Sequence, residues 1–265
     1  TLSNITITSG RTDIYSQPTA GYCSMEIINL DETAIEVDVN DQVTIEIKDS
    51  TGTYVPLFGG FVTDIDVTVT KGGTQTVSEV IKLVALGALS KLPKALTTGV
   101  LSKDFDGNQI NSILTDLLVN NWNEVPATET WNAYNPTTTW ANAENVGLGT
   151  IDMPGNYELT SRSSDLTDAY SLIALLANSG LGYIYEDAYG RISYADSTHR
   201  ADYLAANGYI ALDATQAYAP GMRTVKRIGD IRNDVTITYK ANATKTASDA
   251  QSISLYGKQA QNIQT

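Results

Sequence analysis

The stretch Thr8–Leu30, TSGRTDIYSQPTAGYCSMEIINL, decides how the first part of the chain folds. It predicts two β-strands joined by a polar turn, because Pro18 fixes φ and Gly21 permits a positive φ in the connection. From residue 22 onward, polar and apolar side chains alternate, which places one set on each face of the second strand. Cys23 belongs to the apolar set and is interpreted as a buried small side chain. The stretch is typical of the opening hairpin of a β-barrel.

Further strands follow as far as residue 90, separated by short turns. Polar and apolar residues alternate around Ile45, and residues 54–70 form one long strand pattern. The pair Gly59-Gly60 inside that pattern indicates a bulge or sharp bend, as at a barrel corner. A strand at 76–86 completes the set, which favours a small antiparallel barrel or sandwich.

The middle of the chain has a different pattern, with helices and a hairpin. Residues 104–118 place apolar side chains at helical spacing behind aspartates that suit a helix N-terminus. A second helix is predicted to be capped by 163–165 and to stop at 178–180. A β-hairpin at 181–194 follows it, and residues 196–222 are predicted to be mostly loop.

Strand patterns return near the C-terminal end. Asn233-Asp234 leads into an alternating strand, residues 242–248 are predicted to form a turn, and a short helical segment ends at Gly257. NDQVTIEIK at 40–48 resembles NDVTITYK at 233–240, which suggests two related β-domains, one at each end.

The predicted fold class is therefore α+β, mainly β. Two small antiparallel β-barrel domains would flank inserted helix-plus-hairpin elements. The predicted domains are an N-terminal, tube-like barrel at 1–90, an α+β region at 91–222, and strands of a second barrel at 223–265, completed by residues from elsewhere in the chain.

The chain is acidic, with 30 Asp and Glu against 17 Lys and Arg and a net charge of −13. The excess is uneven, because residues 223–265 carry a net +4 and the rest of the chain −17. Such a surface repels nucleic acid rather than binding it. The simplest interpretation is a solubilising surface.

The sequence offers few residues for catalysis. It has one cysteine and one histidine, His199, which excludes an internal disulfide and leaves little room for a His-based metal site or catalytic pair. Phosphate-loop, GxSxG, CxxC and HExxH motifs are missing. The sequence therefore predicts no enzyme, no cofactor and no metal site.

Three weaker motifs remain open to a second interpretation. The carboxylate pairs Asp64/Asp66 and Glu186/Asp187 are interpreted as solvated side chains rather than an acid/base pair. The segment DFDGN at 104–108 lacks the acidic ligands of a complete calcium loop. The remaining motif is a long Asn/Thr-rich loop at 121–150, whose tryptophans would either pin the loop to protein or stack on sugars: Trp122, Trp131 and Trp140.

The sequence shows no apolar run of 18 residues, no signal peptide and no lipidation signal. We therefore expect a protein without a membrane anchor that is made in a cytoplasm and stays soluble until it assembles.

Four blocks of sequence, taken in order, carry a resemblance to a known family. They are NITITSGRTDIYSQPTAGYCSMEIINLD (4–31); VNDQVTIEI (39–47) with LFGGFV (57–62); LANSGLGYIYEDAYGRISY (176–194); and the ending from Asn233-Asp234-Val235 to Tyr256-Gly257. This order resembles the N-terminal region of tail hub and minor tail proteins of long-tailed bacteriophages. Residues 121–150 fall outside the family pattern.

The resemblance implies a structural virion protein at the tip of a phage tail. Three copies would form a hub whose six barrels match the sixfold tail tube. The implied partners are the tail tube or distal tail ring, the tape-measure protein and the tip or fibre proteins. DNA would be only a passenger that does not stick to the acidic exit channel.

Turn chemistry and the resemblance together single out ten candidate positions for turns or assembly. They are Gly10, Arg11, Pro18, Gly21, Phe58, Gly59, Gly60, Asn233, Tyr256 and Gly257. The alternative function is a receptor- or glycan-binding β-rich module, and loss of glycan binding on replacing the three tryptophans would favour it.

Overall fold

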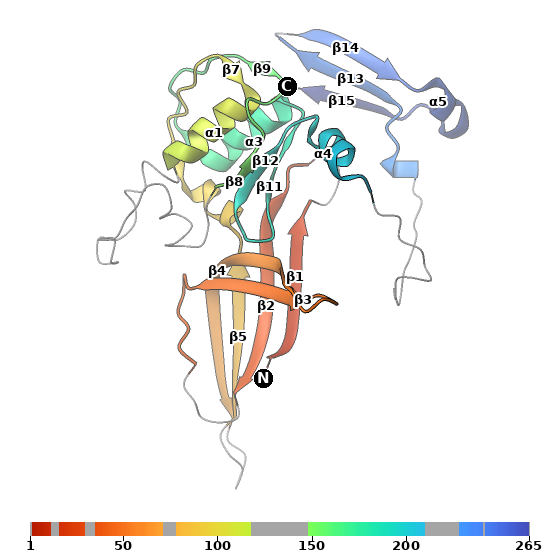
Figure 1. Ribbon diagram of the computed structural model, residues 1–265. Helices are drawn as coiled ribbons and strands as arrows, with labels where there is room; N and C mark the ends of the chain where they lie inside the picture. The colour runs from red at the N-terminus through yellow and green to blue at the C-terminus, as the bar shows by residue number, and fades with distance from the viewer. Residues whose placement is uncertain are drawn as a thin grey trace. The chain divides into compact units, whose positions relative to one another are not determined.

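The computed structural model describes residues 2–11, 16–29, 35–70, 78–117, 148–209, 228–240 and 242–264. The chain divides into two compact units, 1–197 and 198–265, which we describe separately (Figure 1). The architecture is mainly β with some helices, as the sequence predicts. None of the helices in these ranges is long and apolar enough to cross a membrane.

The first unit begins with a five-stranded antiparallel sheet in the order β1-β2-β5-β4-β3. Its strands are β1 (Leu2–Gly10), β2 (Thr19–Asn29), β3 (Gln42–Lys48), β4 (Tyr54–Thr70) and β5 (Ser78–Leu86). The predicted strands are confirmed. Register shifts occur opposite Leu57 and at Thr63, so the irregularities flank Gly59-Gly60 rather than fall on it. Lys71-Gly72-Gly73, whose composition predicts a hairpin turn after β4, lies outside the described residues.

The sheet carries two small apolar clusters, one of Val62, Ile81 and Leu83 and one around which the sheet curls. Cys23, Phe58 and Ala85 are buried at its centre. Ile5 of edge strand β1 and Ile45 of edge strand β3 both pack against this centre. Among the described residues, however, no ladder joins β1 to β3, and the sheet is open. The structure therefore does not confirm the predicted barrel.

The rest of the first unit packs two helices against a three-stranded sheet, β11-β12-β8. The elements are η1 (Ala88–Ser90), η2 (Leu92–Lys94), β6 (Leu96–Thr97), β7 (Asp104–Phe105), α1 (Asp106–Thr115), β8 (Leu148–Ile151), β9 (Glu158–Leu159), β10 (Thr167–Asp168), α3 (Ala169–Ser179), β11 (Tyr183–Glu186) and β12 (Ile192–Ala195). Apolar side chains of the two helices and of the sheet share one buried cluster. The helices contribute Ile110 and Leu114 from α1 and Leu172 and Ile173 from α3, and the sheet contributes Ile184 from β11 and Ile192 from β12. Trp122, Trp131 and Trp140 lie outside the described residues. The predicted loop at 121–150 is wrong at its end, because residues 148–150 belong to β8, which pairs with β12.

The predicted N-cap of α3 at 163–165 is wrong, because the short strand β10 lies between those residues and the helix. Residues 163–165 precede a two-residue ladder in which β10 pairs with β6, and α3 begins only at Ala169. Asp168 is the actual N-cap, because its carboxylate accepts a hydrogen bond from the Ser171 N–H at 2.8 Å. Pairing with β6 holds the chain extended where local sequence alone would allow a helix to start.

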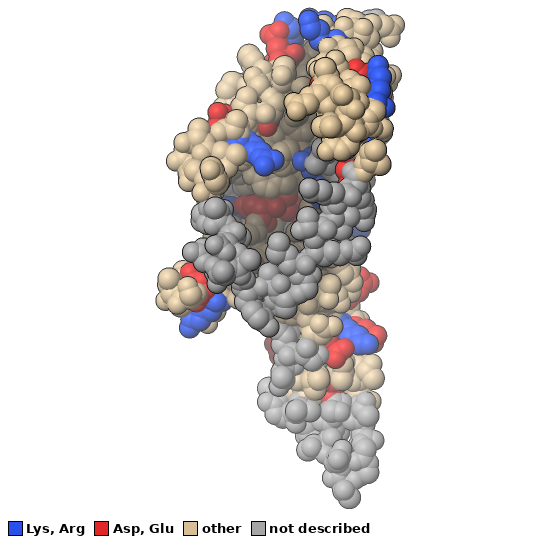
Figure 2. All heavy atoms as spheres, turned by 90° about the vertical axis from the view of Figure 1, so that its right-hand side faces the viewer, with Lys and Arg blue, Asp and Glu red and all other residues tan. Residues whose placement is uncertain are grey.

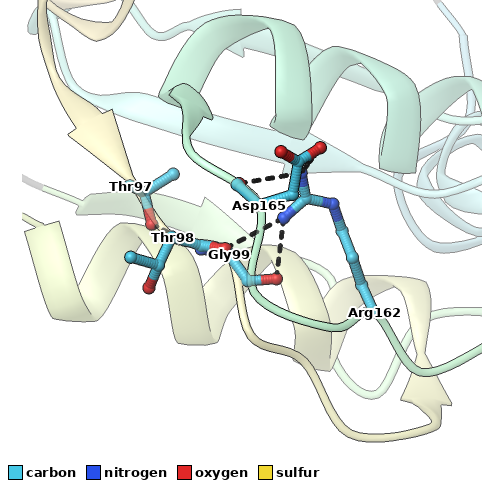
Figure 3. Close-up of polar contacts among 5 residues, drawn as sticks. All are labelled: Thr97, Thr98, Gly99, Arg162 and Asp165. Carbon is cyan, nitrogen blue, oxygen red and sulfur yellow. Dashed lines mark hydrogen bonds and ion pairs between the residues drawn. The ribbon is translucent and has the colours of Figure 1, made fainter.

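Arg162 fixes the segment that enters β10 (Figure 3). Its Nη1 donates to the carbonyls of Thr98 and Gly99, each at 3.1 Å, and its Nη2 donates to the Asp165 carbonyl at 3.1 Å. Gly99 has φ +56°, and a Cβ there would overlap the guanidinium. One planar cation thus satisfies three carbonyls on two segments.

Arg162→Lys should lower the free energy of unfolding by about 1–3 kcal/mol, because lysine has one point charge in place of a fork that reaches three acceptors. Urea denaturation measures the loss. Lys103→Gln is the control, since its ion pair with Glu158 is exposed on both sides and should contribute less than about 1 kcal/mol. Equal losses in the two variants would contradict this account.

Lys91 makes the free energy of unfolding of the first unit depend on pH in the alkaline range. Its Nζ lies 4.1 Å from the centre of the Phe61 ring. Burial, with a smaller contribution from the charge of Lys94, lowers the pKa of Lys91 to about 8. The unfolded chain keeps its proton up to about pH 10.4, so the folded state loses the proton first.

The free energy of unfolding should therefore gain a contribution from Lys91 as pH rises from about 8 to about 10. Denaturation at three pH values across this window measures the slope. Lys91→Met keeps the apolar stem over Phe61 and should remove the contribution, whereas Lys94→Met should retain most of it. The same slope in wild type and Lys91→Met would refute the assignment.

The second unit contains a three-stranded sheet in the order β14-β13-β15. Its elements are α4 (His199–Asn207), η5 (Ile228–Asp230), β13 (Asp234–Tyr239), β14 (Ala243–Ser248), α5 (Ala250–Tyr256) and β15 (Ala260–Gln264). Two predictions are wrong here. Residues 199–207 are helical, and 243–248 form a strand rather than a turn, because β14 pairs in full register with β13.

No apolar side chain is buried among the described residues of this second unit. The buried residue is instead polar, Asn233, at 4% exposure. Small sheets need an apolar face or a packed helix for stability on their own. Hydrogen bonding at Asn233 therefore carries an unusual share of the order in this unit.

Candidate assembly site

The candidate site is a joint within the first unit, where the five-stranded sheet meets α3 and the β11–β12 hairpin. We call it the sheet junction and define it by Gln17, Gly21, Gly59, Glu186 and Gly190. Among the described residues, no group of His, Cys, Asp or Glu is arranged to hold a metal ion. The junction is therefore a candidate for a structural role, carried by its hydrogen bonds and its close backbone contacts.

Gln17 uses both the nitrogen and the oxygen of its side-chain amide to bind α3 and β11, which belong to the part of the first unit after Leu86 that we call the α+β lobe. Its Nε2 donates to Asn178 Oδ1 at 2.7 Å and to the Gly182 carbonyl at 3.1 Å. Its Oε1 accepts the Ile184 N–H at 3.1 Å. The connection between β1 and β2 is thereby tied to the end of α3 and the start of β11, about 165 residues away in the sequence.

Three predicted positions lie beside Gln17. The Pro18 carbonyl accepts the Tyr170 hydroxyl at 2.9 Å. The Arg11 guanidinium lies 4.9 Å from the centre of the Tyr183 ring. Gly10 ends β1 with φ +95°, and a Cβ there would meet no atom within 4 Å, so backbone conformation rather than space favours glycine.

Glu186 is the polar centre of the junction. Its Oε2 accepts the Gly21 N–H and its Oε1 accepts the Leu89 N–H, both at 2.6 Å. Burial raises the pKa of Glu186, while the two backbone hydrogen bonds act in the opposite direction. A Cβ at Gly87 would overlap this carboxylate. The interpretation of Glu186 as a solvated side chain is wrong, because its strand end is docked on the sheet. Asp64, by contrast, is exposed.

Two backbones touch at the turn that follows Glu186 in the same hairpin. A Cβ at Gly59 would overlap the Tyr189 carbonyl, and a Cβ at Gly190 would overlap the Gly59 carbonyl. Gly190 also has φ +79°, as the turn after Asp187 requires. Gly60 lies in the same strand, where a Cβ would overlap the carbonyl of Leu86. The glycine pair thus permits close approach on both sides of β4.

The other predicted positions lie elsewhere. Phe58 is buried at 4% exposure in the core of the curled sheet, directly beside Gly59. In the second unit, Asn233 Oδ1 accepts the Gln259 N–H at 2.7 Å and its Nδ2 donates to the Gly257 carbonyl at 2.8 Å. Gly257 ends α5 with φ +73°, whereas Tyr256 is 48% exposed.

The junction therefore brings together Gly21 and Gly59 from the predicted set, with Pro18 and Arg11 at its rim. Sequence reasoning missed Gln17, Glu186 and Gly190 as partners of these positions. An available signal was the polar Glu186 at the end of an otherwise aromatic and apolar strand. Whether the ten positions act in assembly stays a prediction.

Gly21→Ala should destabilise the first unit by about 1–2 kcal/mol, because the added Cβ would lie 2.8 Å from Glu186 Oε2 and 3.3 Å from the Phe58 ring. Urea denaturation measures this. Gly229→Ala is the matched control, since a Cβ there would meet nothing within 4 Å. A Gly21→Ala protein as stable as the control would show that the junction tolerates displacement of Glu186.

The fold of the chain resembles that of a solved tail protein. The fold matches a tail protein from Neisseria meningitidis with a TM-score of 0.50 and 8% sequence identity, over 98% of this chain and 66% of that one. The chain has the fold of this tail protein. The resemblance seen in the sequence is thereby confirmed at the level of fold. This chain spans just under two thirds of the matched tail protein.

Two weaker likenesses accompany this tail-protein fold. One is a 43 kDa tail protein of a Mu-like prophage from Shewanella oneidensis, with a TM-score of 0.43, 11% identity, and coverage of 99% and 72% of the two chains. The other is an Escherichia coli type VI secretion component with a TM-score of 0.40, 10% identity, and coverage of 74% and 49%. No protein-family model and no curated protein sequence matches the chain.

Proposed function

We propose that this chain is a structural protein of a bacteriophage tail and forms the trimeric hub at the distal end. The observation that carries the proposal is the tail-protein fold, shared over 98% of the chain with the Neisseria protein. In this role it adapts the hexameric tube to the tip or fibre proteins and lines the DNA exit channel. It acts by position and shape and not as an enzyme.

The sheet junction supports a mechanical role. Gln17, Gly21 and Gly59 each meet the lobe through backbone or amide contacts that leave little freedom for sliding. A hub must hold its domains in fixed geometry to match a ring above and a tip below. Rigid contacts between a sheet and an α+β lobe meet that need.

The open edges of the first sheet support a ring. Strands β1 and β3 lie at the two edges of one curled sheet and share one core. Unpaired edges are commonly covered by another element or chain. In the proposal, neighbouring copies cover these edges in the ring, and the regions 1–90, 91–222 and 223–265 are the domains of each copy.

The charge suits a DNA channel. Residues 1–197 carry 25 Asp and Glu but only nine Lys and Arg. On the face shown in Figure 2, acidic and basic side chains lie near each other among many uncharged residues. An acidic excess of this size repels DNA, so DNA would pass without binding. The remaining partners are the tube or distal ring, the tape-measure protein and the tip or fibre proteins.

Two measurements test the proposal. Light scattering of the purified chain, whose monomer mass is 28.5 kDa, would show a trimer. Electron microscopy of tails from the encoding phage, with an antibody to this chain, would place it at the distal tip. A monomer that is also missing from the tail tip would overturn the hub. A protein found at another place in the tail would retain only the structural role.

A further inference from the structure

Glu186 connects three segments of the first unit through one carboxylate. It lies on β11, and its two oxygens accept one N–H from β2 and one from η1, the segment that leaves the five-stranded sheet. Gly21 and Gly87 have no Cβ, which leaves the space the carboxylate occupies. We propose that Glu186 is a protonation-sensitive latch between the five-stranded sheet and the α+β lobe. The inference concerns the fold itself and does not rest on a role in a tail.

Both hydrogen bonds, from the Gly21 N–H and the Leu89 N–H, are formed fully only when the Glu186 carboxylate is ionised. An ionised carboxylate only accepts hydrogen bonds, so each oxygen can face an N–H. A protonated carboxyl carries a hydroxyl on one oxygen, and that oxygen then faces an N–H with a donor of its own. Protonation thus weakens one of the two bonds, at Gly21 or at Leu89, and keeps the other.

The surroundings move this change toward mildly acidic pH. Burial is the largest cause that raises the pKa of Glu186, and the neighbouring charge of Asp187 adds to it. Asp187 is itself paired with Arg191 Nη2 at 2.7 Å. Arg11, the cation on the sheet side, is stacked on Tyr183 of the same strand. The N–H bonds from Gly21 and Leu89 limit the rise.

The sign of the linkage separates the latch from ordinary acid unfolding. A carboxyl whose folded pKa lies above its unfolded pKa binds its proton more tightly in the folded state. Its contribution to the free energy of unfolding therefore grows as pH falls through the folded pKa and is lost as pH rises through it. Protonation therefore changes the hydrogen bond at Gly21 or at Leu89 without undocking the junction, because the docked carboxyl holds its proton more tightly than a solvated one.

Nuclear magnetic resonance of the ¹⁵N-labelled full chain tests the latch directly. The amide proton shifts of Gly21 and Leu89 are followed from about pH 7 to about pH 4, together with those of Cys23 and Ile184 in the adjoining strands. We expect Gly21 and Leu89 to titrate together, with one midpoint above the ordinary glutamate value of about 4.3. Cys23 and Ile184 should not follow that midpoint.

Two variants make the test specific. Glu186→Gln should abolish the shared titration, because its side chain does not ionise. Glu46→Gln removes an exposed strand glutamate and should leave the titration unchanged. Separate midpoints for the two amides, a midpoint at or below the ordinary value, or a shared titration that survives in Glu186→Gln would each overturn the latch. The wild-type titration alone decides the case if Glu186→Gln does not fold.

Discussion

Gly59→Ala should be among the most damaging single-methyl changes in this chain. The added Cβ would overlap the Tyr189 carbonyl, which is backbone and cannot rotate away. The hairpin end must therefore lift from β4, and that movement pulls Glu186 from the Gly21 N–H. We expect a loss of about 3 kcal/mol in the free energy of unfolding, at the upper end for overpacking, measured by urea denaturation.

A double-mutant cycle shows whether the loss comes from this contact. Gly190→Ala breaks the same approach from the other side and adds strain at φ +79°. Once one substitution has separated the backbones, the second should cost much less, so the two losses should not add. Gly229→Ala should stay within about 0.5 kcal/mol of wild type. Additive losses at Gly59 and Gly190 would place the damage elsewhere.

Asn233→Ala should release the last strand of the second unit. The side chain accepts the Gln259 N–H and donates to the Gly257 carbonyl, and both groups would lose these bonds. Two unmet polar groups cost about 2–4 kcal/mol together. Because no described apolar side chain is buried in this unit, that loss is large beside what remains.

Hydrogen exchange measured by mass spectrometry should show residues 260–264 exchanging nearly as fast as an unfolded peptide in Asn233→Ala. Peptides from β11 and β12 in the first unit should keep their protection. Asn262→Ala is the control, because its Oδ1 accepts only an exposed bond from Thr238. Unchanged protection of 260–264 in Asn233→Ala would mean that other contacts hold β15.

Strands were predictable because their evidence is local. Alternation of polar and apolar residues defined β4 to its end residues. The cap of α3 and strand β14 were mispredicted for one reason. Pairing with β6 or β13 determines those residues, and a partner strand leaves no mark in the neighbouring sequence.

The site was less predictable than the strands. Gly21 and Gly59 were singled out as turn or bend residues, but their role depends on Glu186 and Gly190, which lie over 120 residues away. A local window shows a glutamate at the end of an aromatic and apolar strand, but it does not show that this strand end docks on another sheet. The predicted solvation of Glu186 failed for that reason.

The long separation across the junction also has a consequence for synthesis on the ribosome. The five strands of the first sheet are complete at Leu86, whereas the carboxylate that accepts the Gly21 N–H belongs to residue 186. At about 5–20 residues per second, the intervening roughly 100 residues take about 5–20 s to emerge. During that interval the sheet exists without the contacts from Glu186, so the nascent chain has a defined period in which chaperones can meet the part of the sheet that the hairpin later covers.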